Sequence, residues 1–165
     1  MNSVVIYASH FGNTKHIAEA IANELQSRGP VQLLPAEETP AVLPPQTDLV
    51  LVGSPTEGHR MTAPAAEFFA RLTPQALQGV AAAAFDTRLH WPRWLSGSAG
   101  AGITHELRQA GAQVIAREES FFVGGSTNPE QVALEAGELA RAAAWAAGLA
   151  DSLAASAPAT ADAIR

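Results

Sequence analysis

The sequence predicts a doubly wound α/β fold, in which a five-stranded parallel sheet carries helices on both faces. Apolar runs of four to six residues alternate with amphipathic helical patterns along the chain. Most of these runs are apolar at consecutive positions, which is expected of strands buried on both faces. We expect residues 1–154 to form one domain. Residues 155–165, which are small, polar and interrupted by proline, are predicted to form a flexible C-terminal tail.

Apolar runs mark four of the predicted strands. They lie at Val4–Ala8, Val31–Leu34, Leu49–Val52 and Val80–Phe85. A fifth strand is predicted from Val114–Ile115 and Ser120–Val123. The charged triplet Arg117-Glu118-Glu119 separates these two pieces, which predicts a bulge or a kink in the last strand.

Helical patterns lie between these strands, with apolar residues recurring every three or four positions. They cover Asn13–Arg28, a segment after Thr62, Ser98–Ala110 and roughly Leu134–Ala154. Gly29 stands where a helix C-cap belongs, and Thr62 is a typical helix N-cap with Pro64 in the first turn. The segment Pro35–Thr47 is too rich in proline for a full helix and is predicted to be a loop.

Composition excludes several classes of function. A net charge of −6 and a pI near 5.3 argue against nucleic-acid binding. The lack of cysteine excludes disulfides and cysteine-based metal sites, and the five histidines lack metal-ligand spacing. No run is apolar enough to span a bilayer, and no signal peptide precedes the first strand. We therefore expect a cytoplasmic protein without a membrane span or a metal.

The loop between the first strand and the first helix has the composition of an anion site. It reads Ser9-His10-Phe11-Gly12-Asn13-Thr14. A helix N-terminus presents backbone N–H groups and the positive end of a dipole. Two hydroxyls and an amide add donors, and Gly12 permits close backbone approach. We predict that a phosphate binds here, although an ordinary capped helix start is the alternative.

Three loops of this chain resemble those of the flavodoxin family. Six positions resemble the family's signature around the first loop: Tyr7, Ser9, Gly12, Thr14, Ala18 and Ile21. The segment Gly53–Gly58 resembles the family's second FMN loop. The segment from Phe85 to Gly100 looks like the third loop of a bacterial branch. The resemblance spans roughly residues 3 to 150 and keeps the family's order.

This resemblance implies a short-chain flavodoxin with strand order 2-1-3-4-5 and FMN at the carboxyl ends of the strands. It assigns no catalytic side chain. The residues that it assigns to FMN are Ser9, His10, Phe11, Gly12, Asn13, Thr14, Pro55, Thr56, Glu57, Gly58, Asp86, Thr87, Arg88, Trp91 and Trp94.

The chain departs from the family's usual pattern in two places. Phe11 stands where the phosphate loop normally has another hydroxyl, and the segment 57–61 has no aromatic side chain. Trp91 and Trp94 are therefore the aromatics placed for stacking on the flavin. The ring loops carry at least as many basic as acidic side chains: Arg60, Arg88, Arg93, His59 and His90 against Glu57 and Asp86. This predicts a flavin potential less negative than that of a flavodoxin with acidic loops.

We expect an FMN-binding, flavodoxin-like redox protein that carries out electron transfer. One alternative is an NAD(P)H-dependent FMN quinone reductase. The other is a flavodoxin-like binding module that has lost FMN. The expected partner is a redox protein or a small molecule of the NAD(P)H or quinone type, and the sequence is compatible with a monomer or a homodimer.

Overall fold

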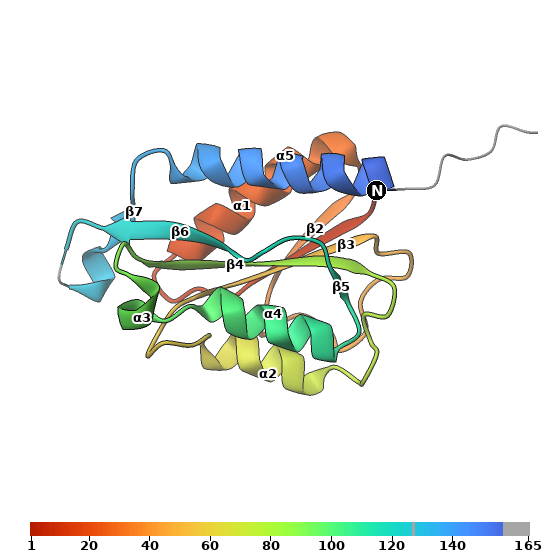
Figure 1. Ribbon diagram of the computed structural model, residues 1–165, viewed down its shortest axis with the longest axis horizontal. Coiled ribbons are helices and arrows are strands. Elements are labelled where there is room, and N and C mark those ends of the chain that lie inside the picture. The colour runs from red at the N-terminus through yellow and green to blue at the C-terminus, as the bar shows by residue number, and fades with distance from the viewer. Residues whose placement is uncertain (127, 157–165) are drawn as a thin grey trace, which may run out of the picture.

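The computed structural model describes residues 1–126 and 128–156, which form one mostly parallel sheet between two layers of helices (Figure 1). The central parallel strands lie in the order β2-β1-β3-β4-β6. Their bounds are β1 (Ser3–Tyr7), β2 (Val31–Pro35), β3 (Leu49–Pro55), β4 (Ala81–Leu89) and β6 (Glu119–Gly124). This confirms the doubly wound sheet and its predicted strand order.

The predicted fifth strand is divided into two. Strand β5 (Gln113–Val114) pairs with the beginning of β4, and β6 pairs with its end. The gap spans residues 115–118 and includes Arg117 and Glu118 of the charged triplet, whereas Glu119 begins β6; the sequence predicted a bulge or a kink here. One strand was not predicted: β7 (Ala133–Leu134) pairs antiparallel with β6. Within residues 1–126 and 128–156 the sheet therefore has seven strands, where the sequence predicted five.

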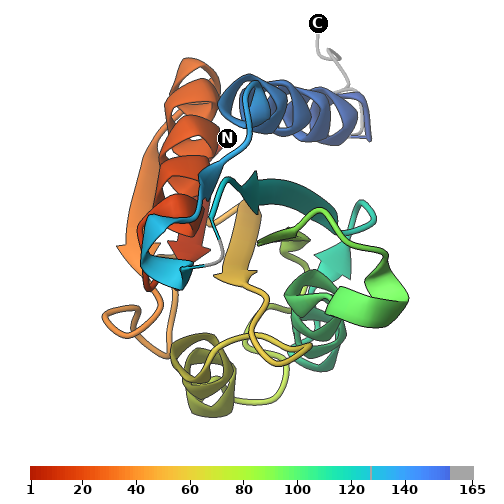
Figure 2. The ribbon, with the colours of Figure 1, turned by 90° about the vertical axis from the view of Figure 1, so that its left-hand side faces the viewer.

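Helices cover both faces of the sheet. Figure 2 shows α1 (Asn13–Leu25) and α5 (Glu138–Ser156) on one side, with α2 (Ala63–Arg71) and α4 (Ala99–Gln109) on the other. The apolar stripe of α1, Ile17, Ile21 and Leu25, is fully buried, as its spacing predicted. On the other face, Phe68 of α2 and the pair Ile103 and Leu107 of α4 are also fully buried.

Short helical turns complete the chain. They are η1 (Gln26–Arg28), α3 (Arg93–Ser96) and η2 (Pro129–Gln131). The sequence did not predict α3, which interrupts the loop after β4. Among the described residues, no helix is both long and apolar enough to cross a membrane.

The last helix differs from its prediction at both ends. It begins at Glu138 and not near Leu134, because residues 133–134 pair with β6 and Gly137 follows with a φ of 89°. Leu139, in the first turn of this helix, is 48% exposed. The helix includes residues 155 and 156 of the predicted tail. The remaining tail residues, 157–165, lie outside the described residues.

Strand direction decides where the loops meet. Because β1, β3, β4 and β6 are parallel, their carboxyl ends lie at one edge of the sheet, at the left in Figure 1. The chain leaves β1 toward α1 on one face, and it leaves β3 toward α2 on the other. Such a switch point is where open α/β sheets bind ligands.

Candidate functional site

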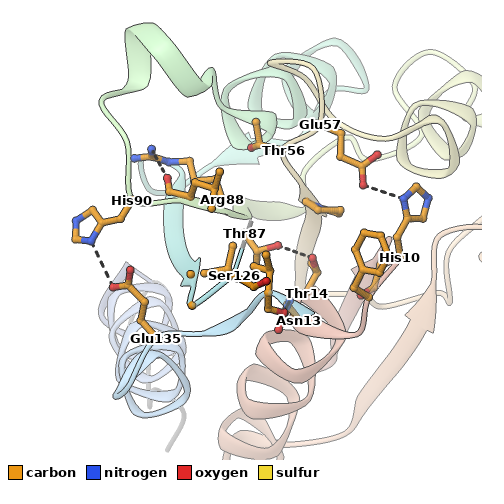
Figure 3. Close-up of a pocket in the computed structure, with 18 of the residues that line it drawn as sticks. His10, Asn13, Thr14, Thr56, Glu57, Thr87, Arg88, His90, Ser126 and Glu135 are labelled. Carbon is orange, nitrogen blue, oxygen red and sulfur yellow. Dashed lines mark hydrogen bonds and ion pairs between the residues drawn. The ribbon is translucent and has the colours of Figure 1, made fainter. Parts of the chain in front are cut away.

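A cavity of about 600 Å³ opens at this carboxyl edge (Figure 3). Its walls come from four segments: the loop before α1, the end of β3, the end of β4 with the following loop, and the chain after β6. The volume lies in the range typical of small-molecule and cofactor sites.

Eleven of the fifteen residues that the sequence assigned to the cofactor line this cavity. They are Ser9, His10, Phe11, Asn13, Thr14, Pro55, Thr56, Glu57, Thr87, Arg88 and Trp91. Gly12, Gly58, Asp86 and Trp94 do not belong to the lining. Tertiary structure therefore brings all three predicted loops to one cavity, with four of their residues turned elsewhere.

The first loop is organised around the Ser9 hydroxyl. Its Oγ accepts hydrogen bonds from the backbone N–H of Gly12 at 3.1 Å and from that of Lys15 at 3.4 Å. Gly12 has a φ of 87°, in the left-handed region where glycine is favoured. Because Ser9 Oγ accepts two hydrogen bonds, its own hydrogen remains for a further acceptor.

A buried pair of hydroxyls lies at the base of the cavity. The Thr14 and Thr87 Oγ1 atoms are 2.7 Å apart, and both residues are almost fully buried (Figure 3). One hydroxyl donates to the other, so one hydrogen of the pair remains available. The contact also fixes the start of α1 against the end of β4.

The Asn13 side chain makes a contact across the chain. Its Nδ2 donates to the carbonyl oxygen of Val132 at 2.9 Å, which joins the start of α1 to the segment before β7. The sequence assigned this amide to a phosphate. In the structure one hydrogen of its nitrogen is donated to the protein, and the second remains for another acceptor.

The second loop is a tight hairpin turn. Glu57 and Arg60 exchange two backbone hydrogen bonds of 2.9 and 3.1 Å. Gly58 and His59 between them have φ values of 52° and 72°, which is the pattern of a type I′ turn. Gly58 does not line the cavity, whereas Glu57 does, and its carboxylate lies 2.8 Å from His10 Nδ1 at the cavity rim.

A second histidine–carboxylate pair lies at the opposite rim (Figure 3). The His90 ring stacks on Phe122 with centroids 3.9 Å apart, and its Nδ1 lies 3.3 Å from Glu135 Oε2. Glu135 comes from the chain after β7. The two pairs thus connect the loops on both sides of the cavity.

The cavity wall formed by the end of β6 and the chain after it was not predicted from the sequence. Its residues are Val123, Gly124, Gly125, Ser126, Val132 and Glu135. The signal available was the Gly124-Gly125-Ser126 run directly after a predicted strand, since such runs at a carboxyl edge favour a binding loop. Leu89 was not assigned to the site either, whereas His90 was placed in a ring loop but was not assigned to the cofactor.

Asp86 has a structural role and does not line the cavity. Its side chain is fully buried, and Oδ2 accepts hydrogen bonds from Ser98 Oγ at 2.7 Å and the Gly100 N–H at 2.9 Å. Thr56 Oγ1 donates to the same oxygen at 3.2 Å. Asp86 therefore joins the second loop to the start of α4.

Charged groups of the lining are few and mostly paired. The basic side chains there are His10, Arg88 and His90, whereas His59, Arg60 and Arg93 lie outside it. Arg93 pairs with Glu118 at 2.6 Å. Burial lowers the pKa of the Arg88 guanidinium, and the nearby Asp86 carboxylate opposes that shift. Arginine nevertheless remains charged.

Two aromatic side chains face this cavity. Phe11 and Trp91 line it and are 52% and 53% exposed. Trp94, which the sequence also placed for stacking, is 83% exposed and lies outside the lining. Trp91 is therefore the aromatic of the third loop that a ligand in the cavity would meet.

Comparisons with known proteins agree with this architecture. A family model described as Flavodoxin matches residues 5–88, just over half of the chain. Oxidised flavodoxin 1 from Bacillus cereus superposes with a TM-score of 0.74 at 20% identity, covering 92% of this chain and 98% of that one. A flavodoxin from the domain Archaea gives 0.71 at 23% identity, covering 93% and 99%.

A flavodiiron protein from Giardia intestinalis also contains this fold, with a TM-score of 0.71 at 20% identity, but the match covers 93% of this chain and only 36% of that one. A search of the curated proteins finds no match. The family model covers the first two loops of the cavity and the strands that hold them. This chain belongs to the flavodoxin family.

Proposed function

We propose that this protein binds FMN in the cavity at the carboxyl edge and serves as an electron-transfer flavoprotein. The observation that carries the proposal is the convergence of three loops, far apart in the sequence, on one cavity of about 600 Å³. Membership of the flavodoxin family supports the same conclusion.

The donors of the cavity suit a phosphate monoester. Ser9 and the Thr14–Thr87 pair each have a hydroxyl hydrogen to spare. The first N–H groups of α1 have no acceptor within the helix, and its dipole favours an anion there. Residues 9–14 include no acidic side chain. These residues would hold the phosphate of FMN.

Apolar side chains of the lining suit a flat ring. Pro55 of β3, Leu89 of β4 and Trp91 of the third loop lie in the same cavity as the phosphate donors. They would exclude water from the ring, and the two histidine–carboxylate pairs would hold the surrounding loops together. When bound, FMN supplies the redox chemistry, whereas the protein determines its orientation and access.

Binding is tested first with the purified protein. Its absorption spectrum before and after addition of FMN shows whether a flavin binds, and titrations with FMN and riboflavin give two affinities. Riboflavin lacks the phosphate. Ser9→Ala should weaken FMN binding by about 1.5–3 kcal/mol, or roughly ten- to a hundredfold, from loss of a hydrogen bond to a charged group. Riboflavin binding should change little.

Ser27→Ala is the matched control, because Ser27 follows α1 at its far end and donates to the Glu24 carbonyl. An equal loss for FMN and riboflavin in Ser9→Ala would show that Ser9 only shapes the loop. A protein that binds neither flavin would contradict the proposal and favour the binding-module alternative.

Electron transfer is tested by reducing the FMN-loaded protein with dithionite in a potentiometric titration and then adding an electron acceptor. Reversible reduction followed by reoxidation supports the proposal. Rapid oxidation of NAD(P)H by the loaded protein would support the reductase alternative instead. The same titration tests the expectation of a potential less negative than that of an acidic-loop flavodoxin.

A further inference from the structure

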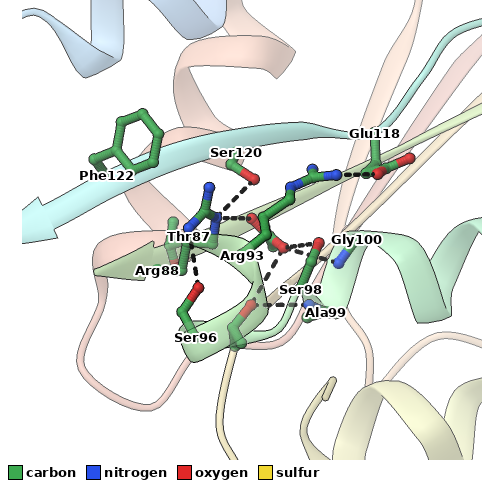
Figure 4. Close-up of polar contacts among 12 residues, drawn as sticks. Thr87, Arg88, Arg93, Ser96, Ser98, Ala99, Gly100, Glu118, Ser120 and Phe122 are labelled. Atoms are coloured by element: carbon green, nitrogen blue, oxygen red, sulfur yellow. Dashed lines mark hydrogen bonds and ion pairs between the residues drawn. The ribbon is translucent and has the colours of Figure 1, made fainter. Parts of the chain in front are cut away.

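The loop that carries Trp91 is anchored by one buried arginine. Strand β4 ends at Leu89, and the chain returns to α4 through α3. The Arg88 side chain lies beneath this loop and is 9% exposed (Figure 4). A charged residue is rarely buried to this extent without a specific set of partners.

The guanidinium of Arg88 connects three parts of the chain. Nε donates to Ser120 Oγ of β6 at 3.0 Å. Nη1 donates to the Trp91 carbonyl at 2.7 Å and to Ser96 Oγ at 3.0 Å. The guanidinium carbon also lies 5.1 Å from the centroid of the Phe122 ring. Arg88 thus joins the neighbouring strand to both ends of the loop.

Trp91 itself has few other restraints. Its indole is half exposed, and its backbone N–H donates to the Leu89 carbonyl at 2.7 Å. The backbone N–H groups of Leu95, Ser96 and Gly97 donate within α3, and Gly97 also forms a β-bridge with His59 of the second loop. The Arg88 contact to the Trp91 carbonyl therefore ties this residue to the sheet.

The charge of Arg88 has a separate partner. Nε lies 4.0 Å from Asp86 Oδ1, an oxygen that is buried and has no hydrogen-bond partner among the described residues. A lysine at position 88 would keep a positive charge near Asp86. A single ammonium group could not reproduce the planar fork that reaches Ser120, Trp91 and Ser96 together.

We propose that Arg88 is a positioning residue of the flavin site, whose guanidinium fork holds Trp91 at the cavity wall. This inference rests on the proposed function for its effect on FMN. The position of Trp91 in the flavin-free protein does not depend on that function.

The experiment labels the three tryptophans with 5-fluorotryptophan and records ¹⁹F NMR spectra without flavin. Trp→Phe variants assign the signals. In Arg88→Lys the Trp91 signal should move toward that of a solvent-exposed indole. The Trp145 signal should stay in place, because Trp145 packs against Phe85 and Phe121 in the core. The affinity for FMN should fall about tenfold.

Arg71→Lys is the matched control. Arg71 also anchors a loop through two backbone carbonyls, those of Ala36 at 2.7 Å and Thr39 at 3.1 Å, but it does not line the cavity. This variant should leave the Trp91 signal and the FMN affinity unchanged.

An unchanged Trp91 signal in Arg88→Lys would overturn the proposal, since it would show that charge alone suffices. Equal losses of FMN affinity in both lysine variants would also overturn it. If Arg88→Lys does not fold, Ser96→Ala removes one contact of the fork: a smaller shift of the Trp91 signal in the same direction supports the proposal, and no shift overturns it. Failure of the wild-type protein to bind FMN would refute the proposed function without altering the NMR result.

Discussion

Replacing Gly53 by alanine should destabilise the protein by about 2 kcal/mol, although it adds a single methyl group. Gly53 lies near the carboxyl end of β3, where a Cβ would stand 2.1 Å from Cε2 and 2.2 Å from Cζ of Phe85. Real Cβ contacts essentially never fall below 3.0 Å, so the ring must move by at least the difference, 0.9 Å.

Phe85 has little room for such a movement. Its ring is fully buried and packs edge to face against Phe121 and Trp145, with centroid distances of 6.3 and 6.2 Å. Overpacking a core generally costs about 1–3 kcal/mol. The loss of chain entropy in the unfolded state would return about 0.4–1 kcal/mol. Since three ring atoms clash, we expect an overpacking cost near the top of that range, about 3 kcal/mol, and hence a net loss of about 2 kcal/mol.

Urea denaturation followed by circular dichroism measures this loss, with Phe85→Leu and the double variant completing a cycle. Leucine lacks the outer ring atoms that clash, so the double variant should be more stable than the sum of the two single losses predicts, by about 1 kcal/mol or more. A Gly53→Ala protein within about 0.5 kcal/mol of wild type, or strict additivity in the cycle, would refute this reasoning.

Two further predictions concern ion pairs. Burial raises the pKa of Glu118, but its backbone hydrogen bond and the Arg93 ion pair outweigh that effect and hold the pKa below its ordinary value of 4.5. The ionised carboxylate therefore stabilises the folded state above that pH, and this stabilisation is lost as the pH falls through the lowered pKa. We expect Glu118→Gln to be less stable than wild type at pH 7 and to lose stability less steeply below about pH 4.5. Plots of stability against pH with the same shape for both proteins would contradict this. Arg141→Met leaves the buried Glu138 carboxylate without its partner at 2.5 Å and should cost about 1–3 kcal/mol in urea denaturation. Arg28→Met, whose Asp151 partner is 63% exposed, should change stability little, and equal losses in the two variants would count against the burial argument.

Local pattern was sufficient for most of the fold. The consecutive apolar positions of β1, β3 and β4 predicted buried parallel strands, and the spacing of Ile17, Ile21 and Leu25 predicted the inner face of α1. Each of these patterns involves residues of a single strand or helix, so it can be recognised from the sequence without knowledge of tertiary contacts. The start of α5 was predicted wrongly because Ala133 and Leu134 pair with β6 and override their helical pattern.

The wall after β6 depends on contacts between distant parts of the chain. Asn13 bonds to Val132, 119 residues away, and His90 meets Glu135 across the cavity rim. Neither pair has a sequence motif, because each exists only once the parallel strands have aligned their carboxyl ends. The residues of this wall could therefore not be predicted from a local sequence motif, as the phosphate loop was.

The sequence by itself determined a parallel α/β sheet, an anion-type loop before the first helix, and three loops of flavodoxin type that would share one edge. Only the tertiary structure decided which side chains face the cavity. Asp86 and Thr87 are neighbours on β4, yet Thr87 meets Thr14 at the base of the cavity while Asp86 holds the start of α4. Successive side chains of a strand point to opposite faces. That alternation is evident in the sequence, but which face becomes the cavity depends on how the strands, helices and loops pack around it.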